Sequence, residues 1–274
     1  ASTKSLYMTA TDKINLNSPL LNYQQQGQGQ HLLLIHGLFG SLENLNMVAK
    51  SLASDFCVTS IDVANHGRSF HRNDMQYSSL AADVVKLLEH LDIEHTFILG
   101  HSMGGKIAMQ IALEYPNIVD RLIVADIAPV QYPAHHEEII AGLKSIDFTK
   151  VKKRQDADSQ LANFVDNIGV RQFLLRNLYL NESKQWQFRC NVDFIAQCYP
   201  QIMKANLLDE NEPYEGHTLF IKGGASNYIQ AEHKDAISTL FPHAKAKIIQ
   251  GAGHWLHAEK TIAFNKIVSE FLKY

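Results

Sequence analysis

Short apolar runs that alternate with helical patterns constrain the fold of this chain more than any other feature of its sequence. The runs Leu32–Ile35, Thr96–Leu99 and Leu122–Ala125 are apolar on both faces, as strands must be when helices cover both sides of a sheet. A further β-rich run covers Phe56–Asp62, and apolar residues recur at helical spacing over Leu42–Ser54, Ser79–Leu91 and Ser102–Glu114. The alternation predicts βαβ units and therefore an α/β fold with a mostly parallel, doubly wound sheet.

The alternation stops in the middle of the chain, between about Pro129 and Pro213, and then resumes. The helices predicted inside the interruption are Glu138–Leu143, Gln160–Ile168, Arg171–Leu180 and Asp193–Gln201. The elements predicted after it are strands at Thr218–Ile221 and Lys247–Ile249 and helices at Glu232–Leu240 and Thr261–Leu272. We therefore expect a core domain made of residues 1–130 and 213–274, interrupted by an all-helical insertion at residues 131–212.

Two short strands are predicted ahead of the parallel sheet, at Leu6–Ala10 and Leu20–Tyr23, with a turn around Asn17-Ser18-Pro19 between them. They are expected to form an antiparallel edge. The glutamine-rich stretch that follows, residues 24–30, is low in complexity and is interpreted as a solvated turn.

The composition narrows the range of ligands. Lys and Arg number 25 against 28 Asp and Glu, so the chain lacks the sequence-wide positive field that binds nucleic acid or an anionic membrane. No apolar run approaches the roughly 20 residues of a membrane span, and the N-terminal segment lacks the pattern of a secretory signal. An odd count of 3 cysteines argues against a disulfide framework and favours a reducing cytoplasm. We expect a cytoplasmic protein that acts on a small molecule.

Ser102 is the candidate nucleophile. It lies in Gly100-His101-Ser102-Met103-Gly104, a G-x-S-x-G motif between a predicted strand and a predicted helix. The chemistry needs the glycines because a strand that turns sharply into a helix holds the serine in a strained conformation where flanking side chains would collide. The helix that follows directs its N-terminal N–H groups toward the serine oxygen, which favours developing negative charge there.

The same residues allow a second interpretation, since Gly100–Lys106 also matches G-x-x-x-x-G-K, the phosphate-binding loop of nucleotide hydrolases. That loop requires Ser or Thr after the lysine to hold Mg²⁺, and this chain has Ile107 there. The missing oxygen ligand disfavours a nucleotide hydrolase.

His254 is the candidate general base among the 14 histidines. It follows the last predicted strand in the glycine-rich loop Gly251-Ala252-Gly253-His254-Trp255, at the carboxyl edge of the sheet, where open α/β sheets bind ligands. Imidazole titrates near neutrality, as a base that activates a hydroxyl should. A metal pair of His254 and His257 would lack a third ligand, so no metal is expected.

Two residues are candidates for the partner that orients the base. A carboxylate is expected after the strand that precedes the last one, but Ser226 occupies this place, and a hydroxyl stabilises an imidazolium far less than a charge does. Asp126 ends the strand after the nucleophile helix, at the same edge of the sheet. Asp126 is therefore the preferred third member of a triad, with Ser226 as the alternative partner of His254.

A second glycine-flanked loop, His36-Gly37-Leu38-Phe39-Gly40, follows the strand His31–Ile35. Attack by a serine places negative charge on the substrate oxygen, and fixed backbone N–H groups stabilise it without reorganising. The predicted donors of this oxyanion hole are the N–H groups of Leu38 and Met103.

With these motifs assembled, the chain resembles the α/β-hydrolase superfamily, and within it a family of small bacterial YbfF-type esterases with mitochondrial relatives. The phrases that carry the resemblance are HGLFGS from His36, NHGRS from Asn65, GHSMGGK from Gly100, DIAPV from Asp126 and GAGHW from Gly251. The resemblance implies a helical cap at residues 131–212 and a serine at the usual acid position, Ser226, as a feature of the group.

The resemblance also implies a carboxylic-ester hydrolase that uses Ser102 and His254, with acyl-CoA thioesters as a second substrate class. No cofactor is expected, the partner is a small-molecule ester, and the sequence leaves monomer and homodimer open. Tyr132, Phe164, Phe173, Trp186 and Tyr199 are expected to shape the acyl pocket. The alternative from another class is a small-molecule receptor on a hydrolase scaffold with little or no turnover, because a fold alone does not imply a function.

Overall fold

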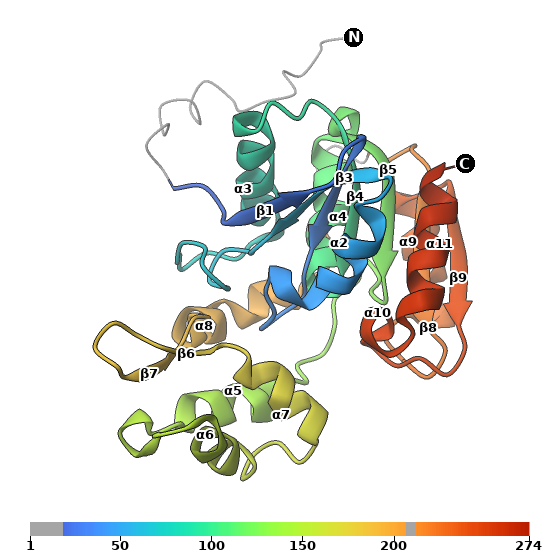
Figure 1. The fold of residues 1–274 in the computed structure, drawn as a ribbon. Helices are drawn as coiled ribbons and strands as arrows, with labels where there is room; N and C mark the ends of the chain where they lie inside the picture. The colour runs from blue at the N-terminus through green and yellow to red at the C-terminus, as the bar shows by residue number, and fades with distance from the viewer. Residues whose placement is uncertain (1–18, 207–211, 274) are drawn as a thin grey trace.

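A central sheet of seven strands organises the described part of the chain, which is residues 19–206 and 212–273 of the computed structural model (Figure 1). The strand order is β1-β3-β2-β4-β5-β8-β9. The strands are β1 (Tyr23–Gln26), β2 (Gln30–Ile35), β3 (Phe56–Ile61), β4 (Thr96–His101), β5 (Val119–Ala125), β8 (Thr218–Gly223) and β9 (Ala244–Ile249). The pairing of β1 with β3 is antiparallel and all other neighbours in this sheet are parallel. The predicted mostly parallel α/β fold is confirmed.

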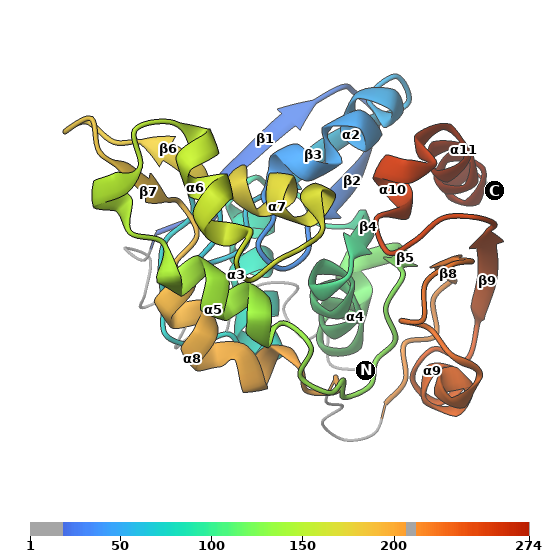
Figure 2. The ribbon, with the colours of Figure 1, turned by 90° about the horizontal axis from the view of Figure 1, so that it is seen from below.

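Helices cover both faces of the sheet, as the two-sided apolar strands require. Within β2, Leu33 and Ile35 join the core that contains α3 and α4 side chains, whereas Leu32 and Leu34 join the core that contains α2 and α11 side chains. Figure 2 shows α2 and α11 on one side of the sheet and α3 and α4 on the other. The helices of this part are α2 (Asn46–Leu52), α3 (Tyr77–His90), α4 (Met103–Glu114), α9 (Lys234–Leu240), α10 (Leu256–Glu259) and α11 (Thr261–Lys273).

Between β5 and β8 the chain forms a group of elements that lie together below the sheet in Figure 1, here called the insertion. Its elements are α5 (Glu137–Ser145), α6 (Arg154–Leu161), α7 (Ile168–Leu175), β6 (Leu178–Leu180), β7 (Trp186–Phe188) and α8 (Val192–Ile202). Short 3₁₀ turns occur at Leu42–Leu45, Pro116–Ile118, Phe148–Lys150 and Ala231–His233.

The prediction of an all-helical insertion is wrong, because β6 and β7 form an antiparallel hairpin. The segment Leu178–Leu180 continues the apolar spacing of the helix before it, so its pattern alone favours helix. Its strand conformation depends on pairing with Trp186–Phe188 and on the Arg189 guanidinium, which lies 4.0 Å from the centre of the Tyr179 ring. These contacts join residues that the local pattern treats separately.

The predicted helix Gln160–Ile168 is also wrong in its centre. The helix α6 ends at Leu161, and α7 begins at Ile168 after Asn167, whose side-chain oxygen accepts a hydrogen bond from the Val170 N–H at 3.0 Å. An asparagine cap of this kind satisfies a helix N–H that has no partner inside the helix, so it favours a new helix start.

The predicted pair of N-terminal strands is not tested as a pair, and the one strand described in this region, β1, is displaced from its predicted place and pairs antiparallel with β3. Leu6–Ala10 lies outside the described residues, and β1 covers Tyr23–Gln26 rather than Leu20–Tyr23. The glutamines of β1 are exposed, so the strand depends on backbone pairing with β3 and not on burial. The prediction of a turn over residues 24–30 is wrong at both ends, because residues 24–26 belong to β1 and β2 begins at Gln30. The turn is confined to residues 27–29, where Gly27 and Gly29 have φ of 82° and 121°.

The described residues include no helix that combines the length and the apolar character needed to cross a membrane. All three cysteines, Cys57, Cys190 and Cys198, are free thiols.

Candidate active site

Ser102 lies at the turn between β4 and α4, in a backbone conformation that non-glycine residues rarely adopt, with φ 55° and ψ −121°. The turn is tight because the backbone passes very close to itself. A Cβ on Gly100 would lie 2.1 Å from the Gly104 carbonyl oxygen, and a Cβ on Gly104 would lie 2.2 Å from the Ile35 carbonyl oxygen. The two glycines are therefore required for the geometry that presents the serine.

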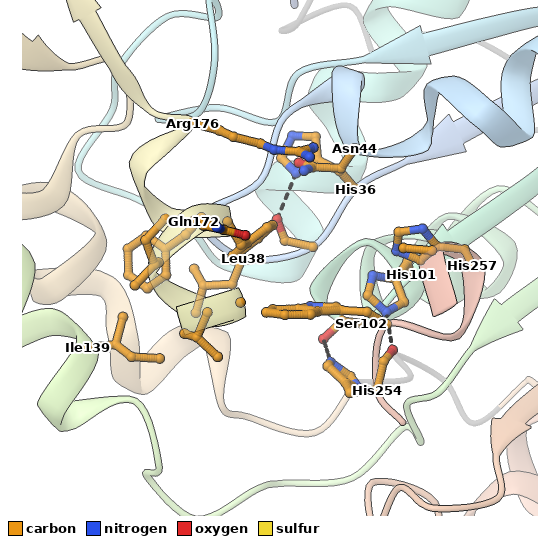
Figure 3. A pocket seen from close by; sticks show the side chains of 18 of the residues that line it. His36, Leu38, Asn44, His101, Ser102, Ile139, Gln172, Arg176, His254 and His257 are labelled. Atoms are coloured by element: carbon orange, nitrogen blue, oxygen red, sulfur yellow. Dashed lines mark hydrogen bonds between the residues drawn. The ribbon is translucent and has the colours of Figure 1, made fainter. Parts of the chain in front are cut away.

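His254 lies within hydrogen-bond distance of both Ser102 and Asp126, and Figure 3 shows Ser102 and His254. The distance from Ser102 Oγ to His254 Nε2 is 2.8 Å, and that from His254 Nδ1 to Asp126 Oδ2 is 2.7 Å. A carboxylate accepts only, so Nδ1 carries the proton and Nε2 is free to accept the serine hydroxyl hydrogen. The three side chains, from β4, β5 and β9 loops, have the arrangement of a nucleophile, a base and an orienting acid.

Asp126 is completely buried, with 0% of its side chain exposed, and has a positive φ of 56°. Besides His254, two donors hold its carboxylate. The Gly223 N–H donates to Oδ1 at 3.0 Å, and the Ser226 hydroxyl donates to Oδ2 at 2.5 Å. Asp126 contacts His254 directly, and Ser226 stands behind Asp126, so both sequence candidates belong to one hydrogen-bonded series.

The loop of residues 36–40 packs against the serine, since a Cβ on Gly37 would lie 3.2 Å from Ser102 Cβ. Two buried histidines fix this loop. His36 Nε2 accepts from the Val63 N–H at 3.0 Å, and His66 Nε2 accepts from the Phe39 N–H at 3.0 Å. Burial lowers the pKa of His36 and lowers that of His66 to about 3, so both rings stay neutral and can accept these bonds.

The two residues predicted to supply oxyanion donors lie beside Ser102. Leu38 lines both cavities that contain the serine, and Met103 lines the smaller one. Met103 is the first residue of α4, so its N–H has no acceptor inside the helix. Both residues therefore lie in the walls of the space next to Ser102.

A cavity of about 530 Å³ opens above Ser102 and His254, between the sheet edge and the insertion. Figure 3 shows Leu38, Ile139 and Gln172 around it, with Arg176 pointing toward Asn44 and His36 at the far end. Its apolar wall is formed by Leu38, Ile139, Val170, Phe173, Leu174 and Trp255. A second cavity of about 30 Å³ is also lined by Ser102, together with Met103, Lys106 and Ile127.

Of the five aromatic residues expected to shape the pocket, Phe173 lines the larger cavity and Tyr132 the smaller one. Phe164, Trp186 and Tyr199 line neither. Sequence reasoning missed Tyr228, which lines both cavities, because it lies in a loop without a motif. The sequence could have pointed to Tyr228 only through its position two residues after Ser226, the alternative partner of His254.

Lys106, the lysine of the rejected phosphate-loop interpretation, is buried with 2% of its surface exposed. Its ammonium group donates to the carbonyl oxygens of Val130 at 2.7 Å and Lys204 at 2.6 Å. Burial lowers its pKa to about 7. Lys106 therefore joins α4 to the chain segments that lead into and out of the insertion.

Two more buried histidines lie beside the base. His101 Nε2 is 2.8 Å from the His254 carbonyl oxygen and so donates to it, and the His101 ring packs against His257 at 4.5 Å between centres. Burial lowers the pKa of His101 well below its usual value and lowers that of His257 to about 4.

The described residues contain no group of three His, Cys, Asp or Glu side chains arranged to hold a metal ion.

A serine on a strained strand-to-helix turn, a histidine from the loop after the last strand and a buried aspartate on a mostly parallel sheet together define an α/β hydrolase. The chain belongs to the alpha/beta hydrolase fold family, whose model matches residues 30–261.

Three comparisons refine this placement. The chain is 35% identical to the esterase YbfF of Escherichia coli (strain K12), over 94% of this chain and 99% of that protein. It is 39% identical to the sn-1-specific diacylglycerol lipase ABHD11 of Mus musculus, over 88% of this chain and 80% of that protein. A solved marine microorganism esterase matches with a TM-score of 0.90 at 39% identity, over 93% of this chain and 100% of that one. The resemblance drawn from the motifs is confirmed.

Proposed function

We propose that this protein is a serine hydrolase that cleaves carboxylic esters of small to medium acyl groups through an acyl-enzyme on Ser102. The observation that carries the proposal is the hydrogen-bonded series from Ser102 Oγ through His254 to Asp126, opening into an apolar cavity of about 530 Å³. The names of the relatives, an esterase, a lipase and a marine esterase, support an ester as the substrate.

In the proposed reaction, His254 Nε2 removes the hydroxyl proton as Ser102 Oγ attacks the acyl carbonyl carbon. The Leu38 and Met103 N–H groups stabilise the oxyanion, and Asp126 stabilises the imidazolium. His254 then gives its proton to the departing alcohol, which leaves the acyl group on Ser102. Water then attacks the acyl carbon while His254 Nε2 takes its proton. As the bond between the acyl carbon and Ser102 Oγ breaks, His254 returns this proton to the serine oxygen, and the acid is released.

The acyl-enzyme chemistry does not depend on an oxygen leaving group, so acyl-CoA thioesters belong to the same chemical range. The rates of hydrolysis of p-nitrophenyl esters of increasing chain length and of the matching acyl-CoAs measure the preferred acyl length and the activity on thioesters. The cavity size supports activity that rises from acetyl to a medium chain and then falls.

The experiment that tests the function compares release of p-nitrophenol from p-nitrophenyl acetate and butyrate by the wild-type protein and by Ser102→Ala. Sustained turnover that is lost in Ser102→Ala supports the esterase. The control is Ser145→Ala, which removes a serine of α5 that lines neither cavity. Release of at most one equivalent by the wild-type protein would instead identify a receptor on a hydrolase scaffold.

A further inference from the structure

Tyr228, which belongs to none of the sequence motifs, stacks on the ring of the proposed base. The centres of the Tyr228 and His254 rings are 3.7 Å apart and their planes differ by 13°. The bonds of His254 to Ser102 and Asp126 both lie at ring nitrogens, so they hold the edges of the imidazole and leave its faces to other contacts. The phenol ring covers one of these faces.

The chain fixes Tyr228 itself at three points. Its hydroxyl lies 2.6 Å from His135 Nε2, and its carbonyl oxygen accepts from the Tyr132 hydroxyl at 2.6 Å. Its N–H donates to Ser226 Oγ at 3.3 Å, the same oxygen that donates to Asp126. The orientation of the tyrosine ring is therefore set by the segment before α5 and by the loop that supports the carboxylate.

The donor at the hydroxyl contact follows from the second nitrogen of His135. Its Nδ1 lies 2.9 Å from the Pro133 carbonyl oxygen, which only accepts, so Nδ1 carries the hydrogen. In the neutral imidazole Nε2 is then an acceptor, and the Tyr228 hydroxyl donates to it. Burial raises the pKa of Tyr228 to about 12, so the ring on His254 is a neutral phenol.

We infer that Tyr228 is a positioning residue for His254: its ring holds the imidazole in the plane that reaches both Ser102 and Asp126, and its face stabilises the imidazolium that forms during the reaction. An aromatic face in contact with a cation stabilises it through the ring quadrupole. This inference rests on the proposed role of His254 as the base. It assigns to the tyrosine no bond with the substrate and no proton transfer.

The test compares Tyr228→Phe with Tyr228→Leu. The phenylalanine keeps the stacked ring and loses only the bond to His135, whereas the leucine removes the ring. We expect Tyr228→Leu to lower kcat by about 3- to 30-fold with KM changed less than about threefold, and Tyr228→Phe to retain kcat within about threefold. The control is Phe173→Leu, which removes another aromatic ring from the wall of the same cavity. The Phe173 ring packs against Trp255 and not against His254, so this substitution is expected to change KM.

A second measurement does not depend on the substrate. The low-field proton resonance of the His254 Nδ1–H bonded to Asp126 should persist in Tyr228→Phe and shift or broaden in Tyr228→Leu, while thermal unfolding confirms that both variants are folded. Equal kcat in Tyr228→Leu and the wild-type protein, or equal losses in the two Tyr228 variants, would overturn the inference. Turnover that survives Ser102→Ala would instead overturn the proposed function.

Discussion

The position of Asp126 is fixed by its burial, by its backbone conformation and by its hydrogen bonds. It combines full burial, a left-handed backbone conformation and three donors: His254 Nδ1, the Gly223 N–H and the Ser226 hydroxyl. A buried carboxylate without partners is strongly unfavourable, and these hydrogen bonds offset that cost. The carboxylate is thereby aimed at the imidazole before any substrate binds.

Replacing Asp126 should remove most of the activity. We expect Asp126→Asn and Asp126→Ala to lower kcat/KM for p-nitrophenyl butyrate by about 10³- to 10⁴-fold, because a neutral side chain neither stabilises the imidazolium nor holds the correct tautomer. Ser226→Ala removes one of three donors to the carboxylate and should cost about 3- to 15-fold. The control is Asp147→Asn, which changes a carboxylate that lines neither cavity. Normal turnover in the Asp126 variants would remove this residue from the triad.

The sequence locates Ser102, His254 and Asp126 because each follows a strand whose carboxyl end must meet the same edge of the sheet. It does not decide between Asp126 and Ser226, since their strands, β5 and β8, are parallel neighbours and both loops reach the same place. It also misses Tyr228, because stacking on an imidazole leaves no periodic pattern. Side-chain contacts between loops are decided only when the whole chain is folded.

At the scale of elements, the close approach of α4 to β2 determines where the nucleophile stands. The predicted helices and parallel strands of the core agree with the structure except at the starts of two helices, where Leu42–Leu45 and Ala231–His233 are 3₁₀ turns. The hairpin β6–β7 escapes prediction because three-residue strands carry too short a pattern. Gly104 is the residue that allows the contact between α4 and β2, because its position lacks space for a Cβ.

Gly104→Ala should therefore destabilise the protein, although alanine is the better helix former. A Cβ at this position would lie 2.2 Å and 2.4 Å from the carbonyl oxygens of Ile35 and His36, so backbone must move. We expect the free energy of unfolding in urea to fall by about 1–3 kcal/mol. Gly169, also the second residue of its helix, is the matched control. A Cβ at Gly169 would meet only the Asn167 side-chain oxygen, at 3.2 Å, so Gly169→Ala should change the free energy of unfolding by at most about 0.5 kcal/mol. Equal effects of the two substitutions would contradict the proposed role of Gly104.

Lys106 gives the link between α4 and the insertion a pH dependence. Its pKa is about 7 in the folded protein, below the value of an unfolded lysine, so between pH 7 and 9 the unfolded chain binds the extra proton. Stability should rise with pH in this window, by at most about 1.4 kcal/mol per unit. The neutral amine keeps two N–H groups for the Val130 and Lys204 carbonyls. Urea unfolding of Lys106→Met should lose this slope, and a slope that persists in the variant would assign it to another group.

At the scale of the whole molecule, the fold buries a set of histidines as neutral rings. Burial lowers the pKa of each below its ordinary value, to about 3 in His66 and His136 and about 4 in His257. The pKa values of His36 and His101 are lowered for the same reason. These rings support the loops around the candidate site, so the architecture that positions the site also makes the protein sensitive to acid.

The free energy of unfolding should fall steeply as the pH drops from 6.5 toward 4. In this window the histidines of the unfolded chain take up protons, with a pKa near 6.5, while the buried histidines of the folded chain stay neutral. Protons therefore favour the unfolded chain, and the stability that is fully present above pH 6.5 is lost as the pH falls. Each contributes at most about 1.4 kcal/mol per pH unit. Urea unfolding at half-unit steps measures the slope, and His66→Gln should reduce it by one proton because the amide can replace both ring contacts. The control is Ser69→Ala, a nearby substitution that removes no titrating group and should lower the free energy of unfolding equally at every pH. A free energy of unfolding of the wild-type protein that stays level from pH 7 to 5 would refute the assignment of neutral buried rings.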